Sequence, residues 1–150
     1  MSFDIHIDVI LCALTVLGIR SLMNWYRSPR VWIIEDNECD MDLLRYRIKT
    51  QDVAFTYLSS VDDFAKQITT PWNFKKPDLV ICDYHLDKGV KGTKIIDLCE
   101  RNGVKDCLLI TGDDKEILGI DSSKVIRKSA DKEFYETLSN WIMTRELKHG

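Results

Sequence analysis

The chain has 150 residues, of which 45% are hydrophobic and 30% are charged, and its formal net charge is −3. This length fits about one domain, the composition is that of a globular protein with a core, and the acidic balance excludes a general nucleic-acid binder, because phosphate contacts need a basic surface. Five cysteines with no C-x-x-C pair and no histidine cluster favour reduced thiols over disulfides or a zinc site.

Residues 1–28 differ from the rest of the chain. An unbroken run of apolar or small residues extends from Val9 to Ile19, and a helix over residues 5–23 would be about 28 Å long, close to the roughly 30 Å core of a bilayer. Acidic residues precede the run and arginines follow it. By the positive-inside rule, this segment is predicted to be a membrane anchor that holds the remaining chain at the cytoplasmic face of the inner membrane.

Two other interpretations of the same segment stay open. The strictly apolar part is short and Asp8 lies at one end of it, which also suits a helix that packs against protein, with the chain in the cytoplasm. A cleaved signal peptide fits less well, because acidic residues occupy the place of a basic n-region and no small-x-small cleavage site follows.

Ser28-Pro29 marks the start of a second unit over residues 29–150, because proline disfavours helix in the residue before it. Short apolar runs predict strands over residues 30–34, 53–58, 77–83, 107–110 and 125–127. Amphipathic patterns predict helices over residues 39–49, 61–68, 93–101, 113–118 and 134–147, the first two capped by Asn37 and Ser60. Residues 84–92 are expected to form a loop, with glycines at 89 and 92.

This alternation predicts a doubly wound α/β fold, in which right-handed crossovers build a parallel sheet with helices on both faces. Polar residues end four of the strands, and the carboxyl ends of parallel strands meet at the edge where ligands bind. These residues are Glu35 and Asp36 after the first strand, Asp83 at the end of the third, Thr111 after the fourth and Lys128 after the fifth.

The chemistry of this group points to phosphoryl transfer. Three carboxylates brought together repel one another unless a cation lies among them, and Mg²⁺ prefers such oxygen ligands. The lysine and the threonine hydroxyl can neutralise and hold a phosphoryl group beside Asp83, which is the candidate nucleophile for an acyl phosphate.

Four segments resemble the receiver domains of two-component response regulators when they are taken together and in this order. They are Val31-Trp32-Ile33-Ile34-Glu35-Asp36-Asn37, Asp78-Leu79-Val80-Ile81-Cys82-Asp83-Tyr84-His85-Leu86, Leu108-Leu109-Ile110-Thr111-Gly112 and Val125-Ile126-Arg127-Lys128. The resemblance covers about residues 30–147. It implies a single-domain, flavodoxin-like receiver with strand order 2-1-3-4-5.

The resemblance also implies roles for the site. Asp83 would accept a phosphoryl group from a phosphohistidine on a histidine kinase or phosphotransfer protein. Glu35, Asp36 and Asp83 would hold Mg²⁺ directly or through water, with the backbone carbonyl of His85 as a further ligand. Thr111 and Lys128 would contact the phosphoryl oxygens.

Three departures from the family pattern concern the signalling face. Ser129 follows Lys128 where the family usually has proline, Val125 stands at the aromatic switch position, and only sixteen residues separate Thr111 from Lys128. These features motivate an alternative, a receiver-like interaction module in which phosphorylation is weak or lost.

The order of the motifs excludes one other function, and the position of the last helix bears on the expected partners. A haloacid dehalogenase-type phosphatase is excluded, because it needs an Asp-x-Asp motif early in the chain, whereas here Tyr84 and His85 follow Asp83. The chain stops shortly after the last helix, so output is expected through contact with a downstream protein and not with nucleic acid. Membrane contact through residues 5–23 is expected, and a homodimer is left open.

Overall fold

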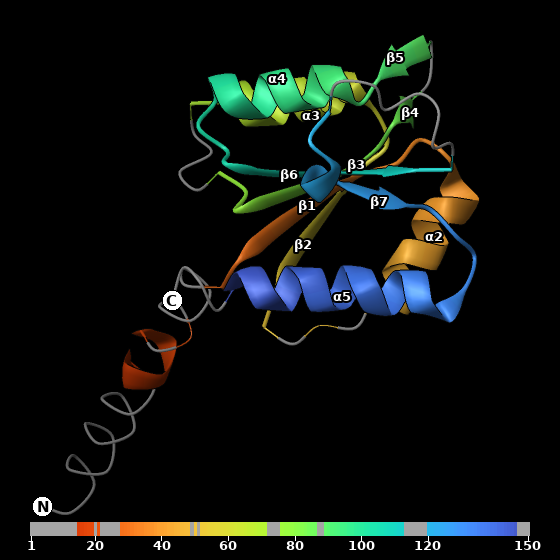
Figure 1. Cartoon of the computed structure of the whole chain (residues 1–150). Coiled ribbons are helices and arrows are strands. Elements are labelled where there is room, and N and C mark those ends of the chain that lie inside the picture. The colour runs from red at the N-terminus through yellow and green to blue at the C-terminus, as the bar shows by residue number, and fades with distance from the viewer. Residues whose placement is uncertain are drawn as a thin grey trace, which may run out of the picture.

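The computed structural model describes residues 15–19, 21, 28–48, 50, 52–71, 76–86, 89–112 and 120–146. A five-stranded parallel sheet lies at the centre of the fold (Figure 1). Its strands are β1 (Arg30–Ile34), β2 (Ala54–Leu58), β3 (Leu79–Asp83), β6 (Asp106–Thr111) and β7 (Val125–Arg127). The predicted five-stranded parallel sheet is therefore confirmed.

The strands lie in the order β2-β1-β3-β6-β7. The numbers 4 and 5 belong to two short strands outside this sheet, β4 (His85–Leu86) and β5 (Val90–Lys91), which pair as an antiparallel hairpin. The prediction of a plain loop over residues 84–92 is therefore wrong. Two-residue strands are too short to produce a pattern with a period of two, which is the sequence signal for a strand.

Helices cover both faces of the sheet. They are α2 (Glu38–Arg47), α3 (Val61–Thr69), α4 (Thr93–Arg101) and α5 (Lys132–Glu146). Figure 1 shows α3 and α4 on one face and α2 and α5 on the other, and a short 3₁₀ helix over Ser122–Lys124 leads into β7. The helix predicted over residues 113–118 lies outside the described residues.

Alternation along the strands builds two cores, one on each face. In β1, Trp32 and Ile34 pack with α3 and α4, while Val31 and Ile33 pack with α2 and α5. All four side chains are almost completely buried. Burying an apolar side chain of this size contributes about 1.5–3 kcal/mol to folding, so the two cores fix the sheet edge where β1 and β3 end.

Side-chain caps begin the first two of these helices at the predicted residues. The Asn37 side chain accepts hydrogen bonds from the backbone N–H groups of Cys39 and Asp40, and Ser60 accepts one from Asp63. Such caps satisfy N–H groups that have no partner within the helix. The Asn37 cap also fixes where α2 starts relative to the end of β1.

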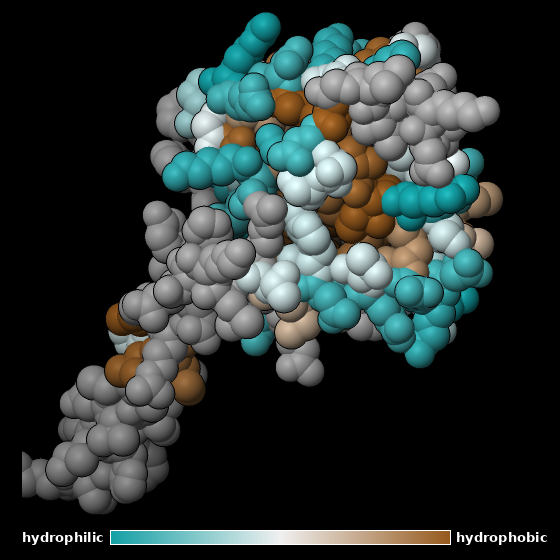
Figure 2. Space-filling view, viewed as in Figure 1, coloured by the Kyte–Doolittle hydropathy of each residue, from teal (hydrophilic) through white to brown (hydrophobic). Residues whose placement is uncertain are grey.

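The segment before the sheet is described only in part. Residues 15–19 are helical, and Val16, Leu17 and Ile19 are each more than half exposed. Figure 2 shows hydrophobic side chains at the surface of the segment that precedes the sheet. Among the described residues, no helix is both long enough and apolar enough to cross a bilayer. Most of the hydrophobic helix predicted over residues 5–23 lies outside the described residues.

Candidate functional site

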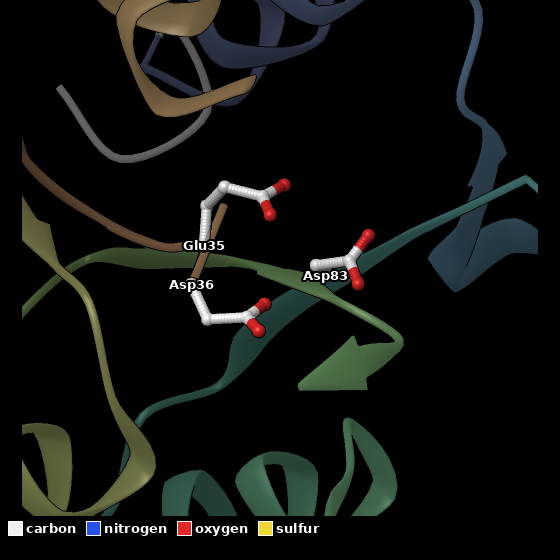
Figure 3. A group of neighbouring side chains, drawn as sticks. All are labelled: Glu35, Asp36 and Asp83. Carbon is white, nitrogen blue, oxygen red and sulfur yellow. The ribbon is translucent and has the colours of Figure 1, made fainter. Parts of the chain in front are cut away.

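Three carboxylates gather at the carboxyl edge of the sheet. Glu35 and Asp36 follow β1, Asp83 ends β3, and one oxygen from each lies within 4.8 Å of the others. Figure 3 shows the three side chains projecting from neighbouring strand ends toward a common space. The structure thus brings together the acidic residues that the sequence predicted as a cluster.

Glu35 is the most buried member of this group, with a side chain 1% exposed. Its Oε2 accepts a hydrogen bond from Lys128 Nζ at 2.7 Å, and its Oε1 accepts one from the backbone N–H of Asn37 at 3.1 Å. Burial raises the pKa of Glu35 above its ordinary value of 4.5, although the bond and charge of Lys128 act against this. Both oxygens of Glu35 therefore already have protein partners.

Asp83 is oriented by one backbone and one side-chain donor. Its Oδ2 accepts a hydrogen bond from the backbone N–H of His85 at 2.8 Å, and its Oδ1 accepts one from Lys128 Nζ at 3.3 Å. The Asp83 side chain is 9% exposed. The carboxylate is thus held at the end of a fully buried strand, yet it still reaches the surface.

Lys128 lies among the carboxylates, as the sequence predicted. Its ammonium contacts Glu35 and Asp83, and it forms a third and shorter ion pair with Asp40 Oδ2 at 2.6 Å. Burial lowers the pKa of Lys128, but the bonds to Asp40 and Glu35 and the charge of Asp83 outweigh it, so the pKa lies above the ordinary value of 10.5. The ammonium therefore stays charged at neutral pH.

Thr111 ends β6 and is 1% exposed. Its backbone carbonyl accepts a hydrogen bond from the backbone N–H of Lys128 at 2.6 Å. This bond continues the pairing of β6 with β7, in which Thr111 lies beside Arg127. Parallel pairing thereby places the threonine and the lysine at one strand-to-strand junction.

Asp40 was missed by the sequence reasoning. It lies in the first turn of α2, where an acidic residue is ordinarily explained by the helix dipole. Its backbone N–H donates to Asn37 Oδ1 at 3.3 Å, so the cap that starts the helix also fixes the backbone from which this carboxylate extends. The only sequence signal was its place one turn after the acidic pair.

Gly92 lets the chain return close beside Asp83 after the β4–β5 hairpin. A Cβ at this position would lie 3.0 Å from the backbone oxygen of Asp83 and 2.8 Å from Leu109 Cδ2. The Gly92 N–H donates to the backbone carbonyl of Tyr84 at 2.8 Å. The segment after Asp83 is therefore tied to the start of α4 through a position where only glycine fits without displacement.

A cleft of about 340 Å³ opens beside the acidic pair, between the first turns of α2 and the end of β2. Its lining includes Asp36, Asp42, Arg45 and Tyr57. The Arg45 guanidinium lies over the Tyr57 ring, 4.9 Å from its centroid. Asp36 is thus reached from solvent through a polar opening.

The donor set fits a hard divalent cation. Carboxylate oxygens within 4.8 Å of one another, at an edge reached from solvent, suit Mg²⁺, which takes one or two protein carboxylates and keeps several waters. Lys128 adds positive charge on the other side of Asp83. The site can therefore hold a cation and an anionic group next to each other.

Comparison with known proteins gives a fold but no close relative. No protein-family model matches the sequence, and no curated protein matches it. Among solved structures, the fold is similar to the receiver domain of the Francisella response regulator 1452, with 10% sequence identity and a TM-score of 0.64, covering 81% of this chain and 99% of that one.

Two further solved structures have a similar fold. The phosphorylated cyanobacterial phytochrome response regulator RcpA is 16% identical with a TM-score of 0.63, covering 81% of this chain and 96% of that one. The signal receiver domain of an HD domain-containing protein from Pseudomonas fluorescens is 16% identical with a TM-score of 0.62, covering 81% of this chain and 95% of that one. At these identities the similarity establishes the fold alone: the chain has the fold of response regulator receiver domains.

Proposed function

We propose that this protein is a phosphoacceptor receiver, in which Asp83 takes a phosphoryl group and the modified domain signals by protein contact. The observation that carries this proposal is the position of Asp83. Its carboxylate lies within 4.8 Å of two further carboxylates and 3.3 Å from the Lys128 ammonium, at the strand edge of a receiver fold. An acid needed only for solubility would not be placed among like charges.

The proposed donor is a phosphohistidine on a histidine kinase or phosphotransfer protein. A carboxylate oxygen of Asp83 attacks the phosphorus, the bond from phosphorus to the imidazole nitrogen breaks, and the imidazole leaves with its electron pair and takes up a proton. The product is an acyl phosphate on Asp83. The hydrogen bond from the His85 N–H to Asp83 Oδ2 orients the nucleophile for this step.

Asp36 and Asp83 would bind Mg²⁺ directly, and Glu35 would contribute through water because its side chain is more deeply buried, 1% exposed against 9% for Asp83. The His85 backbone carbonyl is proposed as a further ligand, since the His85 N–H holds this residue beside Asp83. When bound, the ion neutralises charge on the phosphoryl oxygens.

Lys128 and Thr111 would contact the other phosphoryl oxygens. Lys128 already reaches Asp83 Oδ1, and the backbone bond between Thr111 and Lys128 keeps the two residues together. A phosphoryl group held by both would alter the junction of β6 and β7. That junction is the proposed origin of the signal to a downstream protein.

Labelling of the full-length chain tests this function. Incubation with acetyl phosphate and Mg²⁺ is expected to add a phosphate-sized mass that Asp83→Asn abolishes. Asp97→Asn is the matched control, because Asp97 is exposed on α4, and it is expected to leave labelling unchanged. If the wild type shows neither labelling nor binding of beryllofluoride, a phosphoryl mimic, the phosphoacceptor proposal fails and the receiver-like interaction module replaces it.

We also propose that residues 1–28 tether the domain of residues 29–150 to the cytoplasmic face of the inner membrane. The apolar run from Val9 to Ile19 and the exposure of Val16, Leu17 and Ile19 support this. Membrane fractionation of the full-length protein is expected to recover it with the membranes, and a variant that lacks residues 1–27 is expected in the supernatant. A full-length protein found only in the supernatant would end this proposal.

A further inference from the structure

The Lys128 ammonium is shared by three carboxylates, and the shortest of its contacts goes to Asp40. The distances are 2.6 Å to Asp40, 2.7 Å to Glu35 and 3.3 Å to Asp83. An ammonium has three N–H donors, so these partners match its whole capacity. Any group added to Asp83 must compete with Asp40 for the lysine.

The backbone of Asp40 is also held in place independently of the lysine. Its backbone N–H donates to Asn37 Oδ1, while the Asn37 N–H donates to Glu35 Oε1. The capping residue therefore links the buried Glu35 to the first turn of α2. This turn fixes the backbone from which the Asp40 carboxylate extends to Lys128.

Asp40 adds one negative charge to a site that is already acidic. The carboxylates of Glu35, Asp36, Asp40 and Asp83 against the single ammonium of Lys128 leave a formal charge of −3. A divalent cation reduces this to −1, whereas the same site without Asp40 would become neutral. The extra negative charge favours binding of a cation and opposes the arrival of an anionic group on Asp83.

We propose that Asp40 is a positioning residue that restrains phosphorylation of Asp83 by holding Lys128 and by adding negative charge beside the acceptor. This inference rests on the proposed phosphoacceptor function. Its two effects act in the same direction, since loss of the Asp40 charge would both weaken its hold on one N–H donor of Lys128 and remove a repulsion. Its effect on cation binding has the opposite sign.

Asp40→Asn tests the inference because it removes the charge and keeps the shape of the side chain. In the full-length protein, calorimetric titration with Mg²⁺ alone is expected to show an affinity reduced by about 3- to 10-fold, the scale of one unit charge near a partly exposed site. At saturating Mg²⁺, the affinity for beryllofluoride is expected to rise by about the same factor, because the adduct adds one negative charge to the site.

Two control variants accompany this measurement. Asp40→Glu keeps the charge and is expected to remain close to the wild type in both titrations. Glu136→Gln removes a charge from an exposed pair with Lys132 on α5 and is expected to leave both affinities unchanged. A loss of folding would lower both affinities together, so opposite shifts identify the electrostatic role of Asp40.

The outcomes separate this inference from the function on which it rests. Opposite shifts in Asp40→Asn support the restraint. Shifts in the same direction, or none, overturn it while wild-type labelling keeps the phosphoacceptor function intact. If wild-type protein binds no beryllofluoride and is not labelled by acetyl phosphate, the phosphoacceptor function itself fails, and the restraint fails with it.

Discussion

The backbone N–H of Lys128 donates to the backbone carbonyl of Thr111 at 2.6 Å, one residue beyond the last pair of the β6–β7 ladder. The two side chains proposed to contact the phosphoryl group thus come from neighbouring strands joined by a backbone bond. Since that bond does not involve either side chain, each can be changed while the junction stays in place. This permits separate tests of the two residues.

Thr111→Val removes the hydroxyl and keeps the branched shape at a site that is 1% exposed. We expect the affinity for beryllofluoride with Mg²⁺ to fall about 10-fold or more, because a hydrogen bond to a charged group contributes about 1.5–3 kcal/mol. Thr111→Ser is expected to restore most of it. Calorimetric titration of both variants makes the comparison, and equal affinities for the valine variant and the wild type would contradict a contact from the hydroxyl.

Lys128→Met tests the ion pairs without any metal. At pH 7 we expect the free energy of unfolding to fall by about 2 kcal/mol, because the buried Glu35 carboxylate loses its charged donor. The raised pKa of Lys128 gives a stabilisation that is complete below pH 10.5 and is lost as the pH rises through the folded-state pKa. The stability of the wild type should therefore fall toward that of the variant in strongly alkaline solution.

Urea denaturation at neutral and alkaline pH measures this difference. Lys132→Met is the matched control, because Lys132 pairs with Glu136 on the exposed side of α5. It is expected to change stability little at either pH, as exposed ion pairs contribute little. Equal effects of the two substitutions at pH 7 would show that the buried pairs of Lys128 do not stabilise the fold.

Glu35→Gln is expected to change stability at pH 7 by about 1 kcal/mol or less, because relief of a buried charge offsets the loss of one of the two acceptor oxygens of Glu35. Because burial raises the pKa of Glu35 in the folded state, the stability that this group contributes is present below pH 4.5 and is lost as the pH rises through the folded-state pKa. The ionised side chain therefore lowers stability at neutral pH. Lys128 keeps Asp40 and Asp83 as partners in this variant. The stability of the variant relative to the wild type should fall as the pH falls toward 4.

The exposed Asp42 provides the comparison for Glu35. Asp42 pairs with Arg45 on the same helix and is 75% exposed, so Asp42→Asn should change stability little, as exposed ion pairs contribute little. Chemical denaturation at several pH values follows both variants. A large loss of stability in Glu35→Gln at pH 7 would mean that the ion pair with Lys128 outweighs the cost of burial.

Gly92→Ala is expected to destabilise the fold by about 1–3 kcal/mol, the usual cost of overpacking. The added methyl group would meet Leu109 and the backbone of Asp83 and Tyr84 within 3.1 Å, and backbone atoms cannot move aside cheaply. Gly112→Ala is the control, because a Cβ there meets nothing within 4 Å. Thermal denaturation compares the two, and an equally stable Gly92→Ala variant would show that the return of the chain past Asp83 is less tight than described.

Much of this fold could be predicted because its strands are continuous apolar runs. The predicted strand over residues 30–34 and the predicted helix over residues 93–101 have the bounds that the structure shows. Asn37 and Ser60 act as caps because their side chains accept from the N–H groups of the first turn. These signals are local, so a single sequence contains them.

The features that were missed depend on residues far apart in the chain. Asp40 has an ordinary local explanation at a helix start, and only the fold brings it to Lys128. The β4–β5 hairpin consists of two residue pairs and has no periodicity of its own. Sequence alone could identify the acidic pair and the lysine as partners, but not the competition among carboxylates for that lysine.

Glu35 and Lys128 are 93 positions apart in the sequence. Glu35 directly follows β1, and Lys128 directly follows β7, the last strand of the sheet. Contacts between distant positions form only after the intervening chain has been ordered, and closing a long loop carries an entropic cost. Any partly folded species that lacks β7 therefore contains the acidic cluster without its lysine. The repulsion among the carboxylates is relieved only when the last strand docks, so under the proposed function the site becomes able to accept a phosphoryl group only when the sheet is complete.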